Sequence, residues 1–338
     1  MPEMRQELLG DLLKATSRSF YLTLRVLPAS VRPQISLAYL LARTTDTVAD
    51  TGLIPVDQRL DALKSLRERI SGYHARPLDW TEFEQHQGSP AEKTLLERVE
   101  TSLQLLAELP PPDLKLVRQV LTTITSGQEM DLYLFGKATH GNVVALKNVG
   151  DLDDYTYRVA GCVGEFWTRI CRAHLFPRAR LDENALILDG VRFGKGLQLV
   201  NILCDLGADL KNGRCYIPLQ RLEPVQLLPE TLLSPANQVR FLPIFHGYLN
   251  EAEAHLTAGW RYTNTLPFSQ FRVRLACSWP ILIGARTTRK LRQASVLDLQ
   301  QRVKVPRREV RGILFRSVLT SPFPFLWRRQ YPAPARPD

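Results

Sequence analysis

Long apolar runs are missing from this sequence of 338 residues. Its most apolar stretches, residues 35–42, 185–188 and 280–284, fall well short of the roughly 18 residues that a membrane-spanning helix needs. The amino-terminal segment MPEMRQELLGDLL carries acidic residues early and lacks an apolar run before a small-residue cleavage site. We therefore interpret it as a helix and not as a signal peptide, and we expect a cytoplasmic protein without a membrane anchor.

Cysteine and histidine are also scarce, and neither is spaced for metal binding. The five cysteines include no Cys-x-x-Cys pair, and the six histidines include no pair at a spacing typical of zinc ligands. Such cysteines are typical of buried, reduced thiols in a cytoplasmic protein. The Gly-x-Gly-x-x-Gly motif of dinucleotide-binding α/β folds is absent as well. We therefore expect neither a zinc protein nor a Rossmann-type enzyme.

Alternating apolar and polar residues, the pattern of half-buried strands, are nearly absent. Instead, apolar residues recur every three or four positions in several segments, which predicts helices. These segments are residues 57–70, 91–109, 113–134, 155–174, 185–206 and 241–266. The polar residues 74–90 predict a loop. Because no Gly/Ser-rich linker divides the chain and 44% of its residues are hydrophobic, we predict an all-α protein with one helical domain over residues 1–300.

The net charge of +10 is concentrated near the carboxyl end. Residues 302–338 contain nine Lys or Arg against two acidic residues, interleaved with Phe315, Phe323, Phe325 and Trp327. We treat residues 301–338 as a basic, aromatic tail. Such a tail suits peripheral contact with the anionic inner face of a membrane, where each cation contributes about 1 kcal/mol. A solvated tail whose aromatic residues cap the core fits as well. We expect no nucleic-acid partner, because no nucleic-acid-binding motif is present.

Two segments carry aspartates that must share one face of a helix. In LLARTTDTVAD, Asp46 and Asp50 are four residues apart and Arg43 precedes Asp46 by three, so all three lie on one side. A third Asp-x-x-x-Asp pair, Asp57 and Asp61, lies among charges at the start of an amphipathic helix. Acidic residues there stabilise the helix through its dipole, so we interpret that pair as structural.

The second segment is GLQLVNILCDLGAD. Its polar residues Gln198, Asn201, Asp205 and Asp209 fall within about 80° of the helix circumference. The residues between them are apolar, which argues against a solvated face. Carboxylates taken from water need cations to offset the loss of hydration. Mg²⁺ binds carboxylates together with substrate phosphates, so two such helices predict a magnesium–diphosphate site.

Basic residues lie close to both acidic segments. Arg18 precedes the first acidic segment and Arg43 lies within it. Lys211 and Arg214 follow the second acidic segment. Arginine offers a planar fork of donors that suits phosphate oxygens. A further segment, DLDDYTYRVAGCVGEFW, contains Gly161 and Gly164, which cost helix stability and so indicate close helix packing or room for a ligand.

Six motifs resemble those of one known family in residue type and in order. They are SRSF at 17–20, DTVAD at 46–50, GQEMDL at 127–132, YTYRVAG at 155–161, NILCDLGAD at 201–209 and NGRCYIP at 212–218. Together they span residues 17–218, about two thirds of the chain, and they resemble those of squalene and phytoene synthases. The resemblance implies a single-domain isoprenoid synthase helical fold with a central cavity.

The resemblance also implies roles for individual residues. The Mg²⁺ and diphosphate ligands would be Asp46, Asp50, Asn201, Asp205 and Asp209. The substrate-binding residues would be Ser17, Arg18, Ser19, Phe20, Arg43, Gln198, Asn201 and Arg214. Tyr155 stands where the family has its catalytic tyrosine, and the other catalytic residues would be Asp46, Asp50, Asp205 and Asp209. Two positions depart from the family pattern: Cys204 replaces an arginine and Ala208 replaces a glutamate.

By this resemblance, the reaction joins two farnesyl diphosphates head to head through a cyclopropyl diphosphate, and NADPH then reduces the intermediate to squalene. The basic segment RVKVPRREV resembles one that squalene synthases use near NADPH, and Lys304 is its candidate residue. Phytoene or dehydrosqualene synthesis, without hydride transfer, is the alternative. A non-catalytic family member that acts as an assembly factor is a different alternative, against which the intact aspartates argue.

Overall fold

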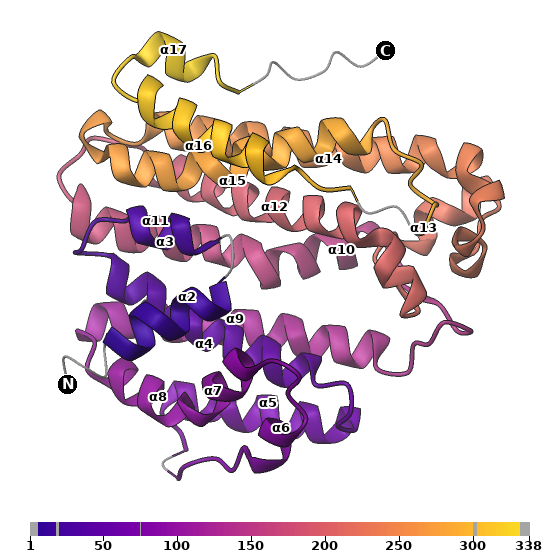
Figure 1. Ribbon diagram of the computed structural model, residues 1–338, viewed down its shortest axis with the longest axis horizontal. Coiled ribbons are helices and arrows are strands. Elements are labelled where there is room, and N and C mark those ends of the chain that lie inside the picture. Colours follow the sequence, from indigo (N-terminus) through magenta and orange to yellow (C-terminus); the bar gives the residue numbers. More distant parts are fainter. Residues whose placement is uncertain (1–5, 18–19, 75, 300–302, 332–338) are drawn as a thin grey trace. The chain divides into compact units, whose positions relative to one another are not determined.

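The structure is a computed structural model that describes residues 6–17, 20–74, 76–299 and 303–331, and helices account for most of these residues (Figure 1). Within that range the strands are β1 (Val144–Ala145) and β2 (Arg214–Cys215). They run parallel and pair Val144 with Arg214 and Ala145 with Cys215. The all-α prediction is therefore confirmed.

The helices alternate with short turns along the whole chain. Those of the amino-terminal part are η1 (Glu7–Leu12, π-helical), α2 (Leu13–Ser17), α3 (Phe20–Val26), α4 (Arg32–Asp50), α5 (Val56–Ser71), α6 (Thr81–Gln85), α7 (Pro90–Glu97), α8 (Val99–Ala107) and α9 (Pro111–Phe135). Those of the remainder are α10 (Val149–Thr156), η2 (Tyr157–Gly161, π-helical), α11 (Cys162–Leu175), α12 (Glu183–Lys211), α13 (Leu219–Leu222), the 3₁₀ turns η3 (Glu223–Val225), η4 (Pro229–Leu233) and η5 (Pro235–Asn237), α14 (Gln238–Thr265), η6 (Phe268–Gln270, 3₁₀), α15 (Phe271–Leu291), α16 (Arg307–Thr320) and α17 (Pro324–Arg328).

The predicted helical segments are confirmed, with local differences. The segment 91–109 is divided into α7 and α8 at Arg98, and the expected loop 74–90 contains the short helix α6. None of the helices in the described ranges is both long and apolar enough to cross a bilayer. The boundary at residue 300, between the predicted domain and its tail, lies outside the described residues.

The chain divides into two compact units. One comprises Met1–Tyr133 and Phe166–Arg178, and the other comprises Leu134–Glu165 and Ala179–Asp338. In the first unit α4 packs against α2, α3, α5, α7 and α8. Its buried apolar residues recur every three to four positions, and fully buried leucines of α5 and α8 belong to the same core. These residues include Ile35, Leu37, Leu40, Leu41, Val48, Leu63, Leu66, Leu105 and Leu106.

In the second unit α12, α14 and α15 pack against one another, and α16 packs against α15 (Figure 1). Glycines let α12 approach the preceding helices very closely. A Cβ added to Gly164 would lie 1.9 Å from the carbonyl oxygen of Gly190, and one added to Gly194 would lie 2.1 Å from that of Ala160. Close packing is thus the reason for glycine at position 164. The contact holds the helix that carries Tyr155 against the helix that carries the second acidic stripe.

The end of the second unit is anchored by one aromatic side chain. Trp327 of α17 is 1% exposed, and its ring stacks on that of Trp260 of α14 with centroids 5.5 Å apart. Its indole nitrogen donates to the side-chain oxygen of Asn264 at 3.1 Å. Arg274 lies over the same indole ring, 5.1 Å from its centroid. Trp327 therefore caps the core, whereas Phe315 and Phe325 remain exposed.

Candidate functional site

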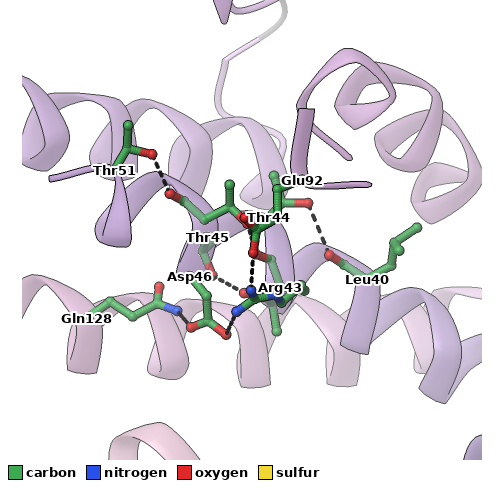
Figure 2. Close-up of polar contacts among 10 residues, drawn as sticks. Leu40, Arg43, Thr44, Thr45, Asp46, Thr51, Glu92 and Gln128 are labelled. Carbon is green, nitrogen blue, oxygen red and sulfur yellow. Dashed lines mark hydrogen bonds and ion pairs between the residues drawn. The ribbon is translucent and has the colours of Figure 1, made fainter. Parts of the chain in front are cut away.

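The first acidic pair lies at the carboxyl end of α4. This helix begins beside Pro33, contains no glycine and ends at Asp50, so Asp50 lies in its last turn and Asp46 lies one turn earlier. The neighbouring threonines are buried and donate their hydroxyls back to the helix, for example Thr44 to the Leu40 carbonyl at 3.0 Å and Thr51 to the Thr47 carbonyl at 2.7 Å (Figure 2). Their hydroxyl donors are therefore used within the helix, and the two carboxylates and Arg43 are the charged groups of this face.

Asp46 is held by Gln128 of another helix, α9, and by Arg43 of its own helix (Figure 2). The side-chain amide of Gln128, in α9, donates to one carboxylate oxygen of Asp46. The guanidinium of Arg43 lies 3.9 Å from the other oxygen and also pairs with Glu92 of α7. Gln128 is itself buried, and its side-chain oxygen has no hydrogen-bond partner within the described residues. These contacts fix the orientation of the Asp46 carboxylate.

The surroundings of Asp46 favour a bound cation. Its side chain keeps 46% of its surface exposed, but protein atoms crowd the carboxyl. This burial and the nearby charge of Asp50 raise the pKa of Asp46 to about 6, against the opposing effects of Arg43 and Gln128. The last turn of a helix also disfavours a carboxylate such as Asp50, by about 0.3–1 kcal/mol, because the unpaired carbonyls there are negative. A cation bound between the two carboxylates would relieve both effects.

The second acidic stripe lies on α12, in the other compact unit. Asn201 is exposed, and Gln198, Asp205 and Asp209 are partly exposed. The apolar residues between them are buried, with Leu199 at 3% and Leu203 at 2% exposure. Asp209 lies in the last turn of α12 and Asp205 one turn earlier, which repeats the arrangement of α4. The same unfavourable helix dipole acts on this pair.

Tyr155 lies in the same unit as this stripe. It is 8% exposed, its ring stacks on that of Tyr216 with centroids 5.0 Å apart, and the two hydroxyls are 3.4 Å apart. Tyr216 follows β2, whose pairing with β1 holds Arg214 in place through the bond from the Val144 amide to the Gly213 carbonyl at 2.8 Å. Gly213 has a φ of 77°, which favours glycine.

Leu299 and Val303, which precede α16, contact α12. The Cys204 thiol, next to Asp205 in sequence, donates to the carbonyl of Val303 at 4.0 Å. The Lys211 ammonium donates to the carbonyl of Leu299 at 2.7 Å. Lys304 is exposed and adjoins Val303 in sequence. The family arginine that Cys204 replaces would stand at this contact.

The remaining candidates belong to the first unit. Ser17 is buried, and its hydroxyl donates to the Leu13 carbonyl. Phe20 stacks on Tyr39 of α4, with ring centroids 5.1 Å apart. Arg18 and Ser19 lie outside the described residues. The structure therefore brings Arg43, Asp46 and Asp50 together in one unit, and it places Tyr155, Gln198, Asn201, Asp205, Asp209, Arg214 and Lys304 in the other.

The donor set fits Mg²⁺. In the part of the chain that the structure describes, no three Asp, Glu, His or Cys side chains gather into a metal site of their own. Each helix instead offers a pair of carboxylates, and Mg²⁺ usually binds through one or two carboxylates, with waters and substrate phosphates as its other ligands. The raised pKa of Asp46 and the carboxylates in both helix-terminal turns show a local excess of negative charge.

Sequence reasoning missed two supporting residues. Gln128 belongs to the GQEMDL motif, but it was not expected to contact Asp46, from which it is separated by 82 residues. Tyr216 belongs to the NGRCYIP motif, and its contact with Tyr155 depends on the pairing of β1 with β2. Both motifs resembled the family, and that resemblance was the only signal for these two residues.

The fold agrees with comparisons to known proteins. The sequence profile of the family "Squalene/phytoene synthase" matches residues 13–309. The chain therefore belongs to the squalene/phytoene synthase family. It is 26% identical over 246 residues to squalene synthase ERG9 of Saccharomyces cerevisiae, a match that covers 73% of this chain and 53% of the yeast protein.

Other relatives belong to the phytoene branch. The chain is 28% identical over 286 residues to the bifunctional lycopene cyclase/phytoene synthase of Blakeslea trispora, covering 81% of this chain and 43% of that protein. The chain thus spans about half the length of these two curated relatives.

Solved structures share the fold. The ligand complex of TcSQS superposes with a TM-score of 0.78 at 20% identity, covering 96% of this chain and 89% of the other. A dehydrosqualene synthase in complex with a ligand superposes with a TM-score of 0.66 at 19% identity, covering 94% of this chain and 99% of the other.

Proposed function

We propose that this protein condenses two farnesyl diphosphates head to head, through a cyclopropyl diphosphate, and then forms squalene with hydride from NADPH. The observation that carries the proposal is the repeated carboxylate pair at the carboxyl ends of α4 and α12, in a chain of the squalene/phytoene synthase family. The carboxyl end of a helix is itself negative, so carboxylates there repel it unless a cation binds to them. Mg²⁺ bound at such carboxylates can in turn bind a diphosphate.

The proposed metal ligands are Asp46 and Asp50 on α4 and Asn201, Asp205 and Asp209 on α12. Mg²⁺ at these oxygens supplies positive charge that stabilises diphosphate as a leaving group. Gln128 and Arg43 orient the Asp46 carboxylate. Oriented ligands need no reorganisation when the substrate binds, which lowers the cost of reaching the transition state.

The first step breaks the C1–O bond of one farnesyl diphosphate, and the bonding electrons leave with the diphosphate. The C2–C3 double bond of the second substrate then attacks C1, and loss of a proton closes the cyclopropane. We propose that Tyr155 takes part in this proton transfer, because its buried hydroxyl faces that of Tyr216 and the pair can relay a proton. We propose that Arg43, Arg214 and Arg18 contact the diphosphates, and that Ser17, Ser19, Phe20 and Gln198 contact the substrate.

In the second half-reaction the cyclopropyl diphosphate ionises and rearranges, and the resulting cation must gain a hydride or lose a proton. NADPH supplies the hydride when it is bound. Lys304 is the proposed contact for its phosphates, because the neighbouring Val303 accepts a hydrogen bond from Cys204 of α12, which precedes Asp205 in sequence. The protein's own residues exclude water, which would otherwise quench the cation.

A product assay tests the proposal. The purified full chain is incubated with farnesyl diphosphate and Mg²⁺, with and without NADPH, and the hydrocarbons are identified by mass spectrometry. We expect squalene only when NADPH is present. An Asp205→Asn, Asp209→Asn double variant serves as the matched inactive control.

The phytoene branch supports a second candidate. The chain is about as similar to the bifunctional lycopene cyclase/phytoene synthase of Blakeslea trispora, at 28% identity, as to the yeast squalene synthase, at 26%. A desaturated C30 product regardless of NADPH would assign dehydrosqualene synthesis, and a C40 product from geranylgeranyl diphosphate would assign phytoene synthesis. Absence of product from either substrate would contradict both candidates and favour a non-catalytic assembly factor.

A further inference from the structure

A cavity of about 460 Å³ lies among α15, α16 and the residues that follow α17, entirely within the second compact unit. Its lining contains none of the proposed catalytic, metal-binding or substrate-binding residues, and Glu309 lies five residues after Lys304. Its lining combines apolar residues with four arginines. The lining residues are Leu282, Ala285, Arg286, Arg289, Glu309, Gly312, Ile313, Arg316, Arg329 and Gln330.

The cavity has an unbalanced positive charge. Four arginines line it against one acid, Glu309, and that acid is already paired with Arg286 at 2.8 Å and with Lys290 at 3.1 Å. Arg289 and Arg316 are exposed, and neither makes an ion pair or a side-chain hydrogen bond with the described part of the chain. The lining thus presents at least two guanidinium groups that pair with no anion among the residues the structure describes.

The outer side of the same helices is apolar and exposed. Phe315 keeps 67% of its surface exposed and Phe325 keeps 64%. The other large apolar side chains exposed there are Val318, Leu319, Phe323 and Leu326. We call this set of six residues the apolar rim. An exposed apolar cluster of this size next to a basic cavity is typical of an interaction site and not of a plain solvated surface.

Helical spacing explains why the two features adjoin. On α16 the cavity-lining residues Glu309, Gly312, Ile313 and Arg316 recur at three- and four-residue intervals, so they share one side of the helix. Leu319 and Phe315 fall at the edge of this side, next to Gly312, and Val318 falls opposite it. Ser317 fixes this rotation, since it is buried and donates to Gln330 at 3.0 Å.

We propose that α16 and α17 dock onto an anionic lipid bilayer, with the apolar rim inserted among the acyl chains and a headgroup phosphate held in the arginine-lined cavity. An apolar face flanked by arginines is the composition of helices that lie in the membrane interface. Arginine forks match phosphate oxygens, and cations beside the surface gain from its negative potential.

Two other partners fit less well. A second copy of this chain would bring two sets of arginines together across a symmetric interface, which places like charges side by side. The phosphates of a nucleic acid would pair with the arginines. The rim, however, includes the aliphatic Val318, Leu319 and Leu326, on which bases cannot stack as they do on aromatic rings. Protein–nucleic acid interfaces are also polar and hydrated, so these side chains would stay in contact with water.

The test is flotation of the full chain with vesicles of phosphatidylglycerol and phosphatidylcholine, compared with vesicles of phosphatidylcholine alone. The cavity variant is Arg289→Gln with Arg316→Gln, and the rim variant is Phe315→Ser with Phe325→Ser. Arg178→Gln with Arg180→Gln is the matched control. Both arginines are exposed and lie outside the cavity, and replacing them changes the net charge as much as the cavity variant does.

Wild type is expected to float with the anionic vesicles and not with the neutral ones. The cavity variant should bind the anionic vesicles about 30-fold more weakly, which is roughly fivefold for each cation lost. The rim variant should lose the binding that persists at high salt, and Arg289→Lys with Arg316→Lys should keep most of the affinity. Circular dichroism checks that each variant is folded, and turnover of substrate in detergent should be unchanged in all of them.

Three results would overturn the proposal. An equal loss in the control variant would show that net charge alone acts. Binding of the cavity variant at wild-type strength would remove the headgroup site. Binding to a DNA duplex with the same dependence on Arg289 and Arg316, without vesicle flotation, would assign the surface to nucleic acid instead.

Discussion

Gln128 of α9 donates its side-chain amide to the carboxylate of Asp46 on α4, across 82 residues of sequence (Figure 2). The amide is buried, so it has few alternative orientations, and it holds one oxygen of Asp46 while the other faces Arg43. The arrangement is that of a supporting residue behind a metal ligand. It makes Gln128 a positioning residue in the proposed site.

Gln128→Ala should reduce turnover and raise the Mg²⁺ concentration needed for half-maximal rate, by about 10- to 100-fold, because Asp46 loses its orienting donor. Steady-state rates over a magnesium titration measure both effects. Gln119→Ala on the exposed side of the same helix is the control and should change neither. If the Mg²⁺ dependence stays at the wild-type value while activity falls, Gln128 has only a structural role.

Asp46→Asn should lower turnover by about 100-fold or more, because the neutral amide cannot offset the charge of a bound cation. Helicity should stay unchanged, since the side chain is 46% exposed and contributes little to the core. Asp61→Asn, at the exposed start of α5, is the comparison and should leave turnover intact. Rates and far-ultraviolet circular dichroism of both variants provide the measurement. Equal loss in the two would contradict our distinction between the functional and structural pairs.

Gly164→Ala should destabilise the second unit by about 1–3 kcal/mol, because the added Cβ would lie 1.9 Å from the Gly190 carbonyl oxygen and force α11 away from α12. Gly247→Ala on α14 is the matched control. No atom lies within 4 Å of its added Cβ, so that variant should gain up to about 1 kcal/mol from its better helix propensity. Urea unfolding of both variants measures the free energies. A neutral effect of Gly164→Ala would show that the two helices separate without cost.

His255 predicts part of the pH dependence of stability. Burial lowers the pKa of His255 to about 4, and the charges of Arg192 and Lys195 act in the same direction. The charge of Asp153 opposes this shift. A carboxylate oxygen of Glu251 lies 3.9 Å from the imidazole. Because the folded pKa lies below the unfolded value of about 6.5, the unfolded chain binds more protons between these two values. Stability is therefore full above about pH 6.5 and is lost as the pH falls towards 4.

His255→Gln should flatten this loss between pH 6.5 and pH 4, whereas His86→Gln at an exposed site should leave the pH profile of the wild type in place. Urea unfolding at several pH values across that window gives the free energies. A wild-type slope retained by His255→Gln would show that other groups produce the pH dependence.

Much of the candidate site could be read from the sequence because helical spacing is a local property. The interval of four between Asp46 and Asp50 places them on one side of any helix, and the pattern from Gln198 to Asp209 does the same for α12. The apolar residues around them predicted buried neighbours, and Leu199 and Leu203 are buried. The motifs also indicated the family, which the profile match confirmed.

Tertiary structure decided which distant groups meet. Nothing near Gln128 in sequence indicates its contact with Asp46, and the stacking of Tyr155 on Tyr216 depends on a two-residue strand pairing. The aromatic residues of the carboxyl end show the same limit. Trp327 is buried against Trp260 while Phe315 and Phe325 are exposed, although all three lie in one basic, aromatic segment. Composition and spacing determine which side chains share a face, and the packing of one helix on another determines whether that face meets protein or solvent.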